Sequence, residues 1–145
     1  TLRLNFQPVS AAGSMPSRAR FRSWLQAALT RNAEVTLRVV DADEGRALNR
    51  DFRGKDYATN VLTFIYENRR GRPLAGDLVL CAPVVAAEAA QQGKAIADHY
   101  AHLTVHGALH LAGHDHEEDS AALRMERREI AILKRFGIAD PYREH

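Results

Sequence analysis

The strongest constraint on the fold is an apolar helix predicted over residues 95–112, AIADHYAHLTVHGALHLA. Apolar side chains recur on nearly every side of this helix, and a helix of that kind is buried. The rest of the chain must therefore surround it. A chain of 145 residues is long enough to bury such a core without disulfides. We expect one domain over residues 1–145.

Histidines interrupt this apolar helix at a spacing that suits a metal ion. His106 and His110 lie four residues apart, so they share one helix face, one turn from each other. Gly113 suits a left-handed turn at the helix end, after which His116 can return toward the same ion. Three imidazoles about 2.0–2.1 Å from Zn²⁺, with a fourth position open to water, are typical of a catalytic zinc site. We therefore predict one zinc ion per chain, bound by His106, His110 and His116.

Other assignments of these histidines stay open. A buried histidine is more often satisfied by hydrogen bonds, although each buried ring then needs its own polar partner. His102 lies four residues before His106, so spacing alone permits a rival pair. His114 could replace His116 as the third ligand. Asp115, between these two, could orient a ligand imidazole or cap the next helix.

The remaining sequence alternates between strand-like and helix-like segments. We predict strands at 2–6, 34–40, 60–66 and 76–82, and helices at 15–32, 41–53, 83–92, 95–112 and 118–136. Strands separated by helices favour parallel pairing, whereas the turn-rich segment 69–76 favours a hairpin. The expected fold is α+β with an α/β-like order. It has one small, mostly parallel four-stranded sheet with an antiparallel edge strand, packed by about five helices around the buried metal-binding helix.

Charge and cysteine content narrow the class of protein only modestly. The net charge is +2, but arginines cluster at 18–22, 50–55 and 69–72. Solvated helix faces and a phosphate-binding surface explain these clusters equally well. The single cysteine excludes an internal disulfide and fits a cytoplasmic location. No stretch reaches the roughly 18 apolar residues of a membrane span, so we expect no membrane partner.

Three segments of the sequence resemble the YbeY family. HGALHLAGHDH (106–116) is similar to the family signature H-G-x-L-H-L-x-G-x-D-H, and NRDFRGKDYATNVLTF (49–64) and GDLVLC (76–81) resemble its other blocks. The order and spacing of the blocks match over nearly the whole chain. Two positions depart from the usual family pattern, since Ala58 stands where proline is common and His114 where tyrosine is common.

The resemblance implies a metal-dependent endoribonuclease specific for single-stranded RNA. Such proteins act in maturation of the 3′ end of small-subunit ribosomal RNA and in ribosome quality control. The implied partners are therefore single-stranded RNA, ribosomal RNA, and the small ribosomal subunit with its associated proteins. The resemblance also implies that zinc is the usual metal, that the histidines matching His106, His110 and His116 bind it, and that the family's important arginine matches Arg53.

Arg53 is the candidate catalytic residue outside the histidine cluster. A guanidinium there could hold a phosphate through two hydrogen bonds and stabilise the charge that develops during phosphodiester cleavage. The alternative is a surface salt bridge with Asp51 or Asp56. With the resemblance in view we favour the phosphate, and we expect Lys55 in the same segment to bind RNA.

Two alternative functions come from other classes. A zinc hydrolase of a small amide or peptide would usually carry glutamate directly after the first histidine, where this chain has Gly107. A ribosome assembly factor without enzymatic activity, whose zinc is structural, would need the same basic surface. Cleavage of RNA by the pure protein distinguishes these alternatives from a nuclease.

Overall fold

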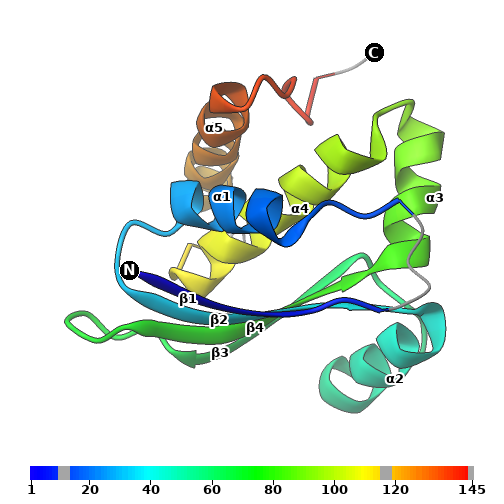
Figure 1. The fold of residues 1–145 in the computed structure, drawn as a ribbon, viewed down its shortest axis with the longest axis horizontal. Helices are drawn as coiled ribbons and strands as arrows, with labels where there is room; N and C mark the ends of the chain where they lie inside the picture. Colours follow the sequence, from blue (N-terminus) through cyan, green and yellow to red (C-terminus); the bar gives the residue numbers. More distant parts are fainter. Residues whose placement is uncertain (10–13, 115–118, 144–145) are drawn as a thin grey trace.

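The computed structural model describes residues 1–9, 14–114 and 119–143. Its elements follow the predicted order (Figure 1): β1 Leu2–Gln7, α1 Arg18–Ala28, β2 Ala33–Val40, α2 Ala42–Arg53, β3 Val61–Glu67, β4 Leu74–Cys81, α3 Ala82–Gln92, α4 Ile96–Leu111 and α5 Asp119–Arg135. Every strand and helix predicted from the sequence is present, with ends that differ by a few residues.

The four strands form one mixed sheet in the order β1-β2-β4-β3. β1 pairs with β2 and β2 with β4 in parallel, whereas β3 and β4 form the predicted antiparallel hairpin. β3 is therefore an edge strand, and Thr63 of β3 lies opposite Leu78 of β4. The predicted α+β fold is confirmed.

The helices divide between the two faces of the sheet. α1, α4 and α5 lie on one face, and α2 lies on the other face at one end (Figure 1). α4 is buried in the middle of the main core, as its apolar sequence predicts. On the opposite face a smaller cluster forms around Val40, Leu62, Val79 and Cys81, with Leu48 of α2 packed against it. α2 thus covers only part of this second face.

Gly107 allows α4 to pack closely on the sheet. A Cβ added there would overlap the side chain of Leu78 and lie 3.3 Å from Cγ2 of Thr63. The helix backbone therefore rests directly against β3 and β4. This contact brings the neighbouring His106 and the edge strand together.

Helix ends mostly follow the signals in the sequence. Asp41 caps α2 by accepting a hydrogen bond from the Glu44 amide at 2.9 Å. Gly54, at φ 71°, ends α2, and Gly113, at φ 100°, follows the end of α4. These glycines adopt the left-handed backbone that other residues rarely do.

Candidate metal centre

The two helical histidines of the predicted metal site are side by side. The ring centroids of His106 and His110 lie 4.9 Å apart in an edge-to-face arrangement. The four-residue spacing on α4 therefore places the two rings next to each other, as the sequence predicts. His116 and Asp115 lie outside the described residues, so the third ligand and the role of Asp115 stay predictions. His114 is exposed, directly after Gly113.

A buried carboxylate contacts one ring nitrogen of His106. Glu129 of α5 is fully buried, and its Oε1 contacts Nδ1 of His106. The hydroxyl of Tyr142, from the chain that follows α5, donates a hydrogen bond to Oε2 of the same carboxylate. A carboxylate that holds one nitrogen of a histidine commonly fixes the other nitrogen toward a metal. With Nδ1 used for Glu129, Nε2 is the nitrogen of His106 that would bind an ion.

The sequence contains a signal for Glu129, although Glu129 is not among the predicted site residues. Met125, Glu129, Ile132 and Leu133 are the buried residues of α5. Their spacing forms one helical face, so Glu129 is a charged residue within an otherwise apolar stripe. Fully buried glutamates are rare unless they are paired, which marks such a position as special.

Glu129 stays ionised despite its burial. Burial by itself would raise the pKa of this carboxyl group, but the contacts with His102 and His106, the charge of His106 and the bond from Tyr142 lower the pKa to about 2. Burial and the bond to Glu129 together raise the pKa of Tyr142 well above its usual value. The phenol therefore remains a hydrogen-bond donor, and the carboxylate remains an acceptor for the imidazole.

His102 also lies beside this carboxylate. Its Nε2 lies 3.3 Å from Oε2 of Glu129, which is within ion-pair distance, but these two atoms do not form a hydrogen bond. The ligand-type atoms of His102, His106 and Glu129 all lie within 4.8 Å of one another, so this group could hold a metal ion. However, tetrahedral ligands about 2.0–2.1 Å from zinc lie roughly 3.3 Å from each other. Glu129 and His106 are closer than that, so we assign Glu129 to orienting His106.

Arg53 lies at the end of α2, against the edge strand. Its Nη2 donates a hydrogen bond to the Thr63 carbonyl at 2.6 Å, and its guanidinium carbon is 5.0 Å from the centre of the Phe64 ring. The Cγ2 atom of Thr63 faces Gly107 of α4. Arg53 and the histidine helix therefore meet the same residue of β3 from two sides.

The alternative salt bridges for Arg53 do not form. Asp51 pairs with Arg50 at 3.0 Å, and Asp56 pairs with Arg46 at 2.7 Å. Within the described residues, no carboxylate forms an ion pair with Arg53. A carbonyl and an aromatic ring orient its positive charge.

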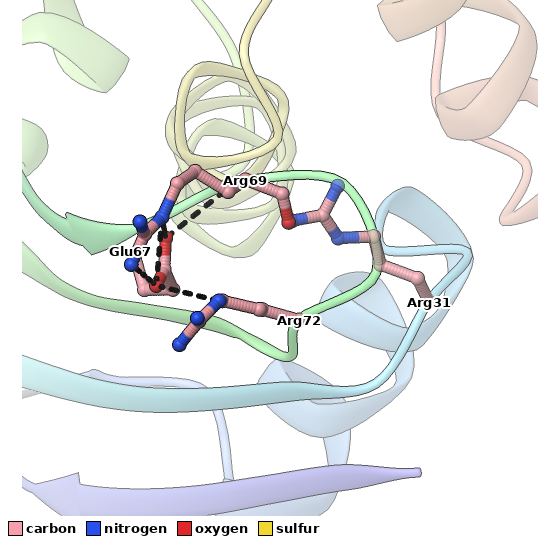
Figure 2. A network of polar contacts seen from close by, with 4 residues as sticks. All are labelled: Arg31, Glu67, Arg69 and Arg72. Carbon is pink, nitrogen blue, oxygen red and sulfur yellow. Dashed lines mark hydrogen bonds and ion pairs between the residues drawn. The ribbon is translucent and has the colours of Figure 1, made fainter.

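Two arginines of the β3–β4 turn differ from Arg53 because they pair with a carboxylate. Figure 2 shows Glu67 with Arg69 and Arg72, whose nitrogens lie 2.7 Å and 3.8 Å from its carboxylate. The hydrogen bonds from Arg69 hold the pKa of Glu67 at about 2. Arg31 donates to the Arg69 carbonyl at 3.0 Å and so ties this turn to the rest of the chain. These two arginines therefore pair with a carboxylate, whereas the described partners of Arg53 are carbonyls and an aromatic ring.

The fold and the site define a class of protein. An α+β sheet carries a buried helix with two adjacent histidines, one of them held by a buried carboxylate, as in metal-dependent hydrolases. No helix in the described ranges is both long enough and apolar enough to cross a membrane.

Comparisons with known proteins identify the family. The family model described as Endoribonuclease YbeY matches residues 14–137. The Endoribonuclease YbeY of Thiobacillus denitrificans is 57% identical over 141 residues, which cover 97% of this chain and 96% of that protein. The Nitrosomonas europaea protein of the same name is 55% identical over 139 residues, covering 96% and 84% of the two chains. The chain belongs to the YbeY endoribonuclease family.

A solved structure supports the fold independently. The solution structure of TM1509 from Thermotoga maritima aligns with a TM-score of 0.58 at 23% identity, covering 99% of this chain and 100% of that one. The likeness shows that the two chains share their fold.

Proposed function

We propose that this protein is a metal-dependent endoribonuclease that cleaves single-stranded RNA. The observation that carries the proposal is the meeting of Arg53 and the histidine helix at Thr63. Arg53, which has no carboxylate partner among the described residues, and the proposed metal-binding face then border the same strand edge. A cation and a metal ion that border one edge can together bind a phosphodiester and stabilise the charge that develops on cleavage. Membership of the family supports the same reaction.

The described residues fit a metal ion of the zinc type. His106 and His110 present adjacent imidazoles, and Glu129 fixes the Nδ1 side of His106. We assign one zinc ion to His106, His110 and His116, with His114, Asp115 and His102 in accessory roles. Imidazole suits zinc among the common protein metals, although it also suits copper, iron and nickel. A bound zinc ion would supply a Lewis acid for a phosphoryl oxygen.

Arg53 would act on the scissile phosphate. Its bond to the Thr63 carbonyl and its contact with Phe64 orient the guanidinium before substrate arrives. A preoriented cation stabilises the extra negative charge of the transition state more than that of the bound substrate. Lys55, exposed just beyond α2, would add a less specific contact with the RNA backbone.

The biological substrate in this proposal is ribosomal RNA. The protein would act in the cytoplasm on the 3′ end of small-subunit ribosomal RNA and in ribosome quality control, together with the small subunit and its proteins. The amide-hydrolase alternative is not favoured, because the relatives are named as endoribonucleases. They equally disfavour an assembly factor without enzymatic activity.

The test is incubation of zinc-loaded protein with a single-stranded RNA, the same RNA in a duplex, and casein, each with and without a chelator. We expect cleavage of the single strand only, and loss of that cleavage with chelator. Cleavage of casein would support the peptide hydrolase. RNA binding without cleavage of any substrate would support the assembly factor.

A further inference from the structure

A cavity of about 490 Å³ lies on the sheet face away from α4, and Arg53, to which the proposed function gives a role in cleavage, is one of the residues that line it. Residues of α2, β2, β3 and β4 line it, among them Arg38, Phe52, Arg53, Phe64, Tyr66 and Asp77. Side chains alternate between faces along β3, and Thr63 faces α4, so Phe64 points to the other side. The volume lies within the roughly 300–1,000 Å³ typical of ligand sites.

Exposed aromatic rings border this cavity. Phe52 is 61% exposed and Tyr66 is 68% exposed, and both line the cavity. Both rings are held in place. Phe52 packs edge-to-face on Phe64 with centroids 5.4 Å apart, and the Tyr66 hydroxyl donates to Asp77 at 2.7 Å. The exposed rings therefore form an ordered surface.

Charges around the cavity select the chemistry of an occupant. At one border lies Arg53, which has no carboxylate partner within the described residues. Arg38 is paired with Glu44, so its charge is largely compensated. Asp77, which accepts the Tyr66 hydroxyl bond, also lines the cavity and would repel a phosphate, but it would not repel a neutral planar group. The cavity thus offers a phosphate contact at Arg53 and an aromatic surface for an uncharged ring.

We propose that this cavity is a nucleobase-binding subsite that stacks an unpaired base of the RNA on Tyr66 and Phe52. The base belongs to a nucleotide next to the phosphate held by Arg53, so the inference rests on the proposed function. Aromatic rings beside a cation bind single strands in this way, because every base has a face that can stack. A base that is paired in a duplex cannot enter the cavity. The subsite therefore gives a physical reason for preferring single strands.

The experiment uses a single-stranded 2′-O-methyl RNA of twelve nucleotides carrying one 2-aminopurine, checked to remain uncut. Stacking on an aromatic ring quenches the fluorescence of this base, so zinc-loaded wild-type protein should quench it on binding. Tyr66→Ala and Phe52→Ala should each weaken binding by about 5- to 150-fold and reduce the quenching. Tyr66→Phe should stay close to wild type, because it keeps the ring and loses only the bond to Asp77.

Phe136→Ala is the matched control. Phe136 is also an exposed aromatic residue, but it borders a separate hollow beside Trp24 of α1. Its removal should change neither affinity nor quenching. Circular dichroism of each variant tests whether the fold is retained, and Tyr66→Phe provides a comparison if an alanine variant fails to fold.

The outcomes separate this inference from the proposed function. Wild-type cleavage of RNA, together with unchanged affinity and quenching in folded Tyr66→Ala and Phe52→Ala, would overturn the subsite and leave the nuclease intact. A Tyr66→Phe loss as large as that of Tyr66→Ala would also overturn it, because the hydroxyl rather than the ring would then matter. Failure of the wild-type protein to bind or cleave RNA would overturn both proposals.

Discussion

Glu129 contacts both His106, a proposed metal ligand, and Tyr142, so its removal tests the proposed centre directly. Glu129→Gln should lower zinc affinity by about 10- to 100-fold, because the amide holds Nδ1 of His106 less strongly. Tyr142→Phe should have a smaller effect in the same direction. Competition with a chromophoric chelator measures both. Glu126→Gln, also on α5, removes an equal charge and should leave zinc affinity unchanged. Equal affinities in all these variants would contradict the assigned role of Glu129.

Replacement of Arg53 tests its proposed role in RNA cleavage separately from RNA binding. Arg53→Ala should keep the fold and the zinc, because the side chain is exposed, but should slow single-turnover cleavage of RNA by roughly 100- to 1000-fold. Arg53→Lys should recover only part of the rate, since an ammonium lacks the planar fork of a guanidinium. Arg50→Ala, next to Asp51 on the same helix, is the control and should cleave at nearly the normal rate. Normal cleavage by Arg53→Ala would remove this residue from the mechanism.

At the scale of elements, α4 depends on its close approach to the sheet. Gly107→Ala gains helix propensity of about 1 kcal/mol, but the new methyl overlaps the fully buried Leu78. Overpacking of this kind costs typically 1–3 kcal/mol, so the free energy of unfolding in urea should fall. The zinc content should fall with it if α4 moves away from β3. A Gly107→Ala protein that is more stable by about 1 kcal/mol, the full gain in helix propensity, would show that this contact is not tight.

The contact between α3 and α4 carries a pH dependence. His99 of α4 is buried and lies 2.9 Å from Glu88 of α3, with Lys94 at 3.5 Å. Burial lowers the pKa of His99, although Glu88 partly opposes this. The unfolded chain then binds a proton more readily than the folded protein. The contribution of neutral His99 to the free energy of unfolding is therefore complete above the ordinary histidine pKa of about 6.5. It is lost as the pH falls below that value.

Urea unfolding at pH 5 and pH 8 measures this effect. The wild-type protein should lose more stability between the two pH values than His99→Gln, which does not titrate and can still bond Glu88. An identical loss in both proteins would show that other groups set the pH dependence.

For the whole molecule, zinc should stabilise the fold as well as support cleavage. Free zinc at about 100 times its Kd should add roughly 3 kcal/mol to the free energy of unfolding, and a chelator should remove it. Metal analysis should find about one zinc per chain in the wild type and in His114→Tyr, and little in His106→Ala or His110→Ala. Loss of zinc from His114→Tyr with retention in His116→Ala would identify His114 as the third ligand.

Local patterns in the sequence were sufficient for the order of elements and for part of the site. Helical periodicity predicted a buried α4 and the adjacent rings of His106 and His110, because both depend on residues within a turn or two of each other. The turn-rich segment before β4 similarly predicted the antiparallel edge of the sheet. The assignment of residues 1–145 to one domain, and of His116 to the metal, stays a prediction.

Contacts between residues far apart in the chain could be identified only from the tertiary structure. Only the packing of α5 on α4 brings Glu129 to His106, since 23 residues separate them in the chain. Whether Asp51 and Asp56 would neutralise Arg53 was open in the sequence, because several arginines lie near both acids. The fold pairs them with Arg50 and Arg46 and turns Arg53 toward Thr63 instead. The sequence determined which residue types could form the site, whereas the packing of helices against the sheet decided which of them meet, because each contact depends on backbone positions far apart in the chain.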